Sequence, residues 1–203
     1  MNSQEAALGC LLGACAGDAA GAVLEFIGRC PTHVEIESAL NMPGGGVWDV
    51  AHGQITDDGE LTLCLAHALA GQPDFEIERV AKQYAAWVES DPFDVGITTR
   101  TSLGCFLRSA HWRAVCARDG YAAGMRRAAA QGCADSKANG SLMRATPLGI
   151  WGHRFSDADL AEFARQDSAL SHPNQSCQDA AHSCALFRHE SFHRHRGRTC
   201  AFG

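Results

Sequence analysis

A threonine and two aspartates stand side by side at Thr56, Asp57 and Asp58, directly before a segment with helical periodicity. Adjacent hydroxyl and carboxylate oxygens are hard ligands, which suit Mg²⁺, Mn²⁺ or Ca²⁺ better than Zn²⁺. The same three residues also make an ordinary first turn of a helix, with Thr56 as N-cap and both aspartates near the positive end of the helix dipole. Taken alone, the triplet favours the capping interpretation over a metal site.

Two further side chains could take part in chemistry but have equally simple structural interpretations. Glu25 closes an apolar segment beside Phe26. A carboxyl group among apolar neighbours can have a raised pKa and act as a general acid or base, although a solvated helix-end glutamate is the commoner case. His172, which precedes Pro173, could contact a ligand or simply bond a nearby carbonyl.

The segments between these residues carry helical patterns. Apolar residues recur at i, i+3, i+4, i+7 and i+8 after Thr56, and Gly71 and Pro73 end that pattern. The helices predicted on such grounds cover residues 5–24, 57–69, 75–89, 98–116, 120–131, 157–170 and a segment after Asn174. Glycines 9, 13, 17 and 21 share one face of the first helix, which predicts close helix packing there. Few runs alternate with period two, so the sequence predicts an all-α fold.

Composition limits the classes of protein to consider. The chain has 203 residues, 17 basic and 23 acidic, and a formal charge of −6, which suits one globular domain and argues against nucleic-acid binding. No apolar run reaches transmembrane length. The apolar N-terminal segment lacks the preceding basic residues of a secretory signal. None of the ten cysteines forms a CxxC pair, so we expect reduced thiols in a cytoplasmic protein without a membrane partner.

Taken together, the polar clusters resemble the ADP-ribosylglycohydrolase family, across about residues 5–186. Three motifs carry most of the resemblance: Gly13-x-x-x-Gly17-Asp18-Ala19-x-Gly21-x-x-x-Glu25-Phe26, Thr56-Asp57-Asp58-x-Glu60-Leu61, and Asn139-Gly140-Ser141-Leu142-Met143-Arg144-x-x-Pro147. A fourth, Ser171-His172-Pro173, comes at the family's usual place. Their order and approximate spacing agree with the family, which makes chance agreement remote.

The resemblance implies a compact, multi-helix fold around two Mg²⁺ or Mn²⁺ ions. By resemblance, Thr56, Asp57 and Asp58 ligate metal and Glu25 is the catalytic or gating carboxylate. The substrate pocket would be formed by Asn139, Gly140, Ser141 and His172. The implied reaction removes ADP-ribose from a modified protein or from a small molecule by cleaving the glycosidic bond at ribose C1. Metals can hold ribose hydroxyls and activate water, and small residues such as Gly140 let the backbone approach the substrate closely.

The sequence departs from the family pattern near Ala185. Family members have a second acidic cluster in a C-terminal third, and this chain has no such cluster. We therefore expect an incomplete domain over residues 1–186, an irregular basic and histidine-rich tail over residues 187–203, and an incomplete binuclear site. Activity would then be impaired, and a catalytically inactive ADP-ribose-binding or structural relative is the alternative interpretation.

Overall fold

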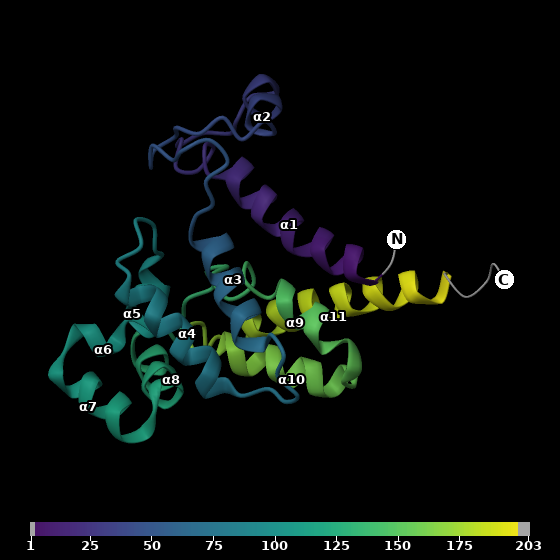
Figure 1. Ribbon diagram of the computed structural model, residues 1–203. Coiled ribbons are helices and arrows are strands. Elements are labelled where there is room, and N and C mark those ends of the chain that lie inside the picture. The colour runs from purple at the N-terminus through teal and green to yellow at the C-terminus, as the bar shows by residue number, and fades with distance from the viewer. Residues whose placement is uncertain (1–2, 199–203) are drawn as a thin grey trace.

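The computed structural model describes the backbone of residues 3–198 and the side chains of residues 4–186 (Figure 1). The regular secondary structure of this part of the chain is helical, and its only bridge of the β type is an isolated one between Gly45 and Val50. The helices are α1 (Ser3–Gly21), α2 (His33–Ala39), α3 (Asp57–Leu69), α4 (Ile77–Glu89), α5 (Ile97–Leu103), α6 (Cys105–Arg108), α7 (Ala110–Asp119), α8 (Tyr121–Gly132), α9 (Thr146–Trp151), the 3₁₀ turn η1 (Gly152–Arg154), α10 (Asp157–Ser168) and α11 (Gln175–Arg198). The predicted all-α class is confirmed.

The core lies among α3, α4, α8, α9, α10 and α11. Leu61 and Leu65 of α3 are fully buried there, as are Tyr84 of α4, Met125 of α8 and Leu160 of α10. Burying a side chain of this size stabilises the fold by about 1.5–3 kcal/mol. The predicted apolar stripe of α3 is therefore the surface that holds this helix, and the aspartates before it, against the core.

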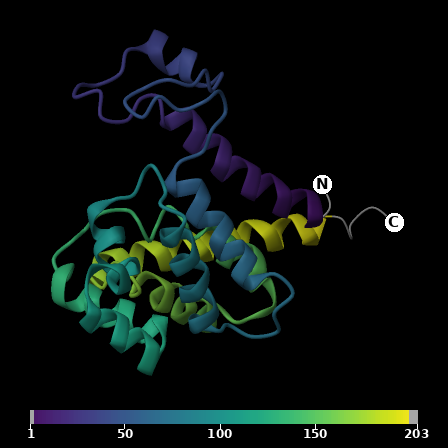
Figure 2. The ribbon, with the colours of Figure 1, turned by 60° about the vertical axis from the view of Figure 1, so that its left-hand side comes forward.

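Helix α1 lies along one side of this core, against α3, α9 and α11 (Figure 1). Figure 2 shows its first turn next to the end of α11, while the loops around α2 stand away from the other helices. The glycine face does not make the close packing that the sequence predicts. A Cβ added at Gly9, Gly13, Gly17 or Gly21 would meet no atom within 4 Å. The contact is made instead through other positions such as the buried Ala19.

Two helical predictions differ from the structure. The expected helix over residues 98–116 is three helices, because Gly104 ends α5 and the side chain of Ser109 caps α7 by accepting a hydrogen bond from the Trp112 N–H. The tail predicted to be irregular continues α11 as far as Arg198. Residues 175–196 contain neither glycine nor proline, and arginine is a good helix former, so nothing local ends the helix earlier. Residues 199–203 lie outside the described part.

A buried ion pair joins α10 to the loop before α9. The guanidinium of Arg144 donates from Nε to Oδ2 of Asp167 over 3.0 Å, and neither side chain is more than 1% exposed. The hydroxyl of Tyr84 donates to the other carboxylate oxygen over 2.8 Å. Each charge is therefore neutralised and hydrogen-bonded, which burial requires.

We expect Asp167→Ala to lower the free energy of unfolding by about 3–5 kcal/mol, because it leaves the Arg144 charge buried without its partner. Urea denaturation followed by circular dichroism measures this change. Glu162→Ala, an equivalent substitution at an exposed position of α10, should change stability by no more than about 0.5 kcal/mol. Equal losses for the two variants would contradict the assignment.

Candidate active site

The start of α3 is held by a carboxylate that comes from α1. The backbone N–H groups of Thr56 and Gly59 each donate to Oδ2 of Asp18 over 2.8 Å, and the Thr56 hydroxyl donates to Oδ1 over 2.7 Å. The N–H groups in the first turn of a helix lack partners within the helix, so Asp18 supplies one from outside. Thr56 stands at the N-cap position, but its side chain makes no capping hydrogen bond. The predicted N-cap position of Thr56 is confirmed, but the side chain that accepts from the first turn is that of Asp18.

Gly59 leaves the space that this contact needs. A Cβ at position 59 would lie 2.6 Å from Oδ2 of Asp18 and 2.9 Å from Cβ of Ile55, closer than such atoms approach. Glycine is therefore required for Asp18 to reach the first turn of α3. The arrangement fixes Asp57 and Asp58, which lie between the two anchored residues.

Most of the predicted site residues meet at one cavity of about 580 Å³. Its lining includes Glu25, Asp57 and Asp58, and also Asn139, Gly140 and His172, which are distant in sequence. Two predicted residues are absent from the lining. Thr56 is buried against Asp18, and Ser141 is buried and accepts a hydrogen bond from the Ser168 hydroxyl over 2.8 Å. The structure thus places these two as supports of the site.

Four carboxylates give the cavity its electrostatic character: Glu25, Asp57, Asp58 and Asp94. The lining contains no lysine or arginine to balance them. Burial and repulsion from Asp57 and Asp18 raise the pKa of Asp58 to about 7, and burial and the neighbouring carboxylates raise the pKa of Asp94 to about 6. Burial, followed by the charges of Asp57 and Asp18, also raises the pKa of Glu25, whose buried Oε2 has no hydrogen-bond partner.

Asp94 and an aromatic rim are the parts of the site that the sequence reasoning missed. Asp94 follows the helix predicted over residues 75–89, in a segment that carries none of the four motifs. Edge-to-face contacts link Phe26 to Trp48 and Trp48 to Phe93, across three separate loops. Two of these rings, Phe26 and Trp48, line the cavity. Phe26 belongs to the first motif, but no local pattern marks Trp48 or Phe93, because the proximity of the three rings arises only when the three loops fold together.

The donor set suits a hard divalent cation, although only in part. Carboxylate oxygens are the ligands that Mg²⁺ and Mn²⁺ prefer, and the unbalanced negative charge would attract either ion. Within the described residues, however, no group of three histidine, cysteine, aspartate or glutamate side chains is arranged to hold a metal. Water would have to complete the coordination of an ion bound to the aspartates.

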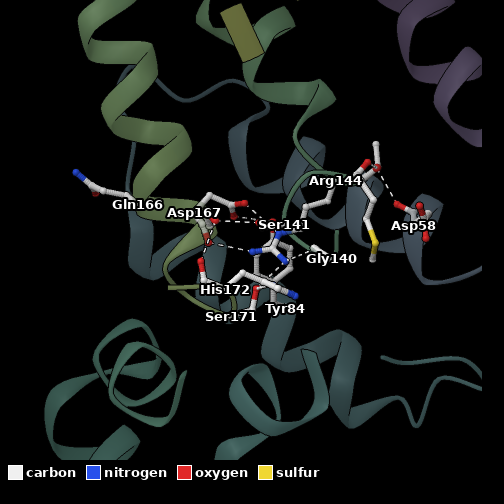
Figure 3. Close-up of polar contacts among 12 residues, drawn as sticks. Asp58, Tyr84, Gly140, Ser141, Arg144, Gln166, Asp167, Ser171 and His172 are labelled. Atoms are coloured by element: carbon white, nitrogen blue, oxygen red, sulfur yellow. Dashed lines mark hydrogen bonds and ion pairs between the residues drawn. The ribbon is translucent and has the colours of Figure 1, made fainter. Parts of the chain in front are cut away.

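The part of the cavity around Gly140 is lined by neutral hydrogen-bonding groups, in contrast to the carboxylates. A Cβ at this position would lie 2.6 Å from Cε1 of His172 and 3.0 Å from Oγ1 of Thr99. Position 140 therefore has no room for a side chain, which keeps its backbone close to the imidazole. Figure 3 shows Gly140 and His172 together, with Asp58 lying apart from them. The cavity thus joins an acidic group to a neutral group of hydrogen-bonding residues.

Comparison with known proteins places this helical fold and acidic cavity in a defined class. A sequence model of the family described as ADP-ribosylglycohydrolase matches residues 1–198, nearly the whole chain. The chain therefore belongs to the ADP-ribosylglycohydrolase family, as the sequence motifs predict.

Individual relatives agree with this assignment. The chain is 31% identical over 180 residues to an ADP-ribosyl-[dinitrogen reductase] glycohydrolase from Rhodospirillum rubrum, covering 88% of this chain and 54% of the relative. It is also 31% identical over 190 residues to the ADP-ribosylarginine hydrolase Tri1 from Pseudomonas putida (strain GB-1), covering 89% of this chain and 44% of that protein. The chain thus spans about half the length of these relatives.

A solved structure described as an ADP-ribosylglycohydrolase-related protein complex has a similar fold. It superposes with a TM-score of 0.70 at 27% sequence identity, covering 94% of this chain and 57% of the other. No helix in the described part of this chain is both long and apolar enough to cross a membrane.

The acidic cavity predicts an unusual pH dependence of stability. Asp58 and Asp94 have a higher pKa in the folded than in the unfolded chain, so the folded state binds more protons. The protonated forms of these two aspartates favour the folded state. This stabilisation is fully present below the ordinary aspartate pKa and is lost as pH rises through about 6 to 7. In buffer with a chelator, the melting temperature should fall between pH 5 and pH 8, and Asp58→Asn should reduce that fall. A melting temperature that rises over this interval in the unsubstituted chain would contradict the assignment.

Proposed function

We propose that the cavity binds the ADP-ribose part of a modified protein side chain and hydrolyses the glycosidic bond at ribose C1, with Mg²⁺ or Mn²⁺ as cofactor. The main support is that one cavity brings Glu25, Asp57 and Asp58 beside Asn139, Gly140 and His172. These two groups have the chemistry needed for the reacting sugar and for the rest of the nucleotide. Membership of the ADP-ribosylglycohydrolase family supports the same assignment.

In this proposal the neutral residues bind the ligand. The Asn139 amide, the backbone at Gly140 and the His172 imidazole offer hydrogen bonds to phosphate or ribose oxygens. The close approach of backbone at Gly140 depends on the missing side chain. These contacts would hold the ribose so that its C1 faces the carboxylates, which lowers the entropic cost of reaching the transition state.

The paired aspartates would hold the metal. Asp57 and Asp58, with Asp94 nearby, supply the hard oxygen ligands, and ionisation of Asp58 would be favoured by a bound cation. When bound, the ion supplies a positive charge that can anchor ribose hydroxyls and make a water molecule more acidic. Thr56, predicted as a ligand, serves here through its hydrogen bond to Asp18.

Glu25 would move the proton during hydrolysis. The water oxygen forms a bond to C1 while the bond between C1 and the acceptor side chain breaks, through a transition state with oxocarbenium character. Glu25 takes a proton from the water and then passes it to the released acceptor atom, which returns Glu25 to its carboxylate form. Burial and neighbouring negative charges raise the pKa of Glu25, which makes it a stronger base than a solvated glutamate.

Arginine is the acceptor that we propose. A guanidinium is cationic and planar, so it suits a cavity with four carboxylates and the exposed rings of Phe26 and Trp48. One relative bears the name ADP-ribosylarginine hydrolase.

We further propose a cytoplasmic location, because the nine cysteines of the described part are free thiols, including Cys105 and Cys116 with their Sγ atoms 3.9 Å apart.

Metal binding by this chain should be weak, and hydrolysis therefore slow. Water completes a coordination sphere less rigidly than protein ligands do, so an ion held by two or three carboxylates dissociates readily. The same observation favours the second candidate function, an ADP-ribose-binding protein without hydrolase activity. The two functions share the ligand and differ only in whether the bond at C1 is broken.

Release of ADP-ribose from an ADP-ribosylated arginine peptide, with added Mg²⁺ or Mn²⁺, tests the proposal. We expect Glu25→Gln to lower the rate by about 10²–10⁴-fold with little effect on ADP-ribose affinity, because it removes the base and keeps the shape. Asp57→Ala and Asp58→Ala should each abolish the release of ADP-ribose that added metal stimulates. Glu37→Gln, at an exposed position of α2, is the control and should not change the rate.

The outcome separates the two candidate functions. Metal-dependent release that Asp58→Ala removes supports the hydrolase. Binding of ADP-ribose without release at any metal concentration supports the non-catalytic protein. If the chain neither binds nor releases ADP-ribose, the proposed function is wrong.

A further inference from the structure

Arg144 lies behind the cavity, outside its lining, and contacts four residues close to His172. One terminal nitrogen of its guanidinium donates to the Gly140 carbonyl over 2.7 Å and to the Ser171 hydroxyl over 2.9 Å. The other donates to the Asp167 carbonyl over 2.9 Å, and Nε donates to the Asp167 carboxylate. The Tyr84 ring lies against the guanidinium, 4.8 Å from its carbon. Figure 3 shows these residues gathered beside His172.

Ser171 connects this cation to the imidazole. Its Oγ lies 2.9 Å from Nδ1 of His172 and accepts a hydrogen bond from Arg144. Arginine can only donate, so it leaves the single hydroxyl proton of Ser171 free to point elsewhere. Ser171 is fully buried, and among the described residues Nδ1 is the one acceptor within reach of that proton. The arrangement that gives the Ser171 hydroxyl proton a partner has Ser171 donating to Nδ1, which places the ring proton on Nε2.

The other ring nitrogen of His172 faces the cavity. His172 is fully buried, and its Nε2 has no hydrogen-bond partner in the protein. The residue lines the cavity beside Gly140, where a Cβ would lie 3.1 Å from Nε2, so the absence of a side chain leaves room next to this atom. A buried polar atom without a partner costs free energy unless a ligand or water pairs with it.

We propose that Arg144 and Ser171 are positioning residues that fix His172 as its neutral Nε2–H tautomer, so that it donates one hydrogen bond to a phosphate or ribose hydroxyl oxygen of ADP-ribose. This inference rests on the proposed function for its ligand, but the tautomer itself does not depend on it. Arg144 acts through Ser171 and makes no contact with the ligand.

The surroundings keep the ring neutral at pH 7. Burial, followed by the positive charge of Arg144, lowers the pKa of His172 to about 4. The charge of Asp167 is directed to Arg144 and Tyr84, and Tyr84 stays protonated because burial and Asp167 raise its pKa. A charged imidazolium would attract the four carboxylates of the cavity. A neutral imidazole does not, and it can still donate a hydrogen bond to the ligand.

The first test measures the tautomer directly in the chain without ligand. Ring ¹⁵N shifts of histidine distinguish the two neutral tautomers, and the His172 signals are identified by their absence in His172→Gln. We expect Nε2–H in the unsubstituted chain at pH 7 and a mixture of tautomers in Ser171→Ala. Ser102→Ala removes an equally buried hydroxyl that bonds only to carbonyls of its own helix, and should leave the His172 shifts unchanged.

The second test measures ADP-ribose affinity by calorimetry, with Mg²⁺ present. Ser171→Ala should weaken binding about tenfold, as expected for a ligand hydrogen bond whose donor is no longer fixed. In His172→Gln the amide donor does not depend on a tautomer, so adding Ser171→Ala to that variant should change affinity less than twofold. Arg144→Lys should resemble Ser171→Ala if circular dichroism shows that it folds.

Two results would overturn the inference. One is an Nδ1–H tautomer in the unsubstituted chain. The other is an equal loss of affinity from Ser171→Ala with histidine or glutamine at position 172, which would mean that Ser171 acts only on packing. Failure of hydrolysis with the predicted tautomer and coupling intact would instead count against the proposed function alone.

Discussion

The hydrogen bonds from Asp18 to the start of α3 are the contact on which the rest of the site depends. One carboxylate accepts from the backbone of Thr56 and Gly59 and from the Thr56 hydroxyl, and so joins α1 to the first turn of α3. The same bonds fix the direction in which Asp57 and Asp58 leave the helix. Like charges repel, and their side chains would separate if the backbone were free. The acidic cavity is thus maintained by a contact outside its own lining.

A second carboxylate, which unlike Asp18 is fully buried, has the corresponding role on the other side of the cavity. Asp167 neutralises Arg144, which in turn bonds the carbonyl of Gly140 and the hydroxyl beside His172. A solvent-exposed arginine could not hold this arrangement, because water would compete for each hydrogen bond. Both groups of cavity residues are therefore positioned by charged side chains that lie outside the lining of the cavity. Under the proposed function, substitutions at either carboxylate would weaken binding without removing a ligand contact.

The sequence predicts the helices and the approximate membership of the site better than the roles within it. Helical periodicity and the four motifs identify α3, α4 and the cavity residues Glu25, Asp57, Asp58 and His172, because these signals are local. Asp94, Phe26 and Trp48 come together only through the fold. The resemblance predicts Thr56 as a metal ligand and Ser141 as a pocket residue, but their hydroxyl groups bond other protein side chains. The helical end of α11 was missed because its composition suggested an irregular tail.

The central claim, that paired aspartates beside a ribose-binding surface hold a divalent cation, is tested most directly by locating that cation in solution. Mn²⁺ added to the ¹⁵N-labelled chain broadens the amide signals near its binding site. The account predicts broadening at the amides of Gly59, Gly96 and Gly140, with none in Asp58→Asn. The account is contradicted if the amide signals of these three glycines stay sharp, or if only signals of the histidines within residues 189–195 broaden.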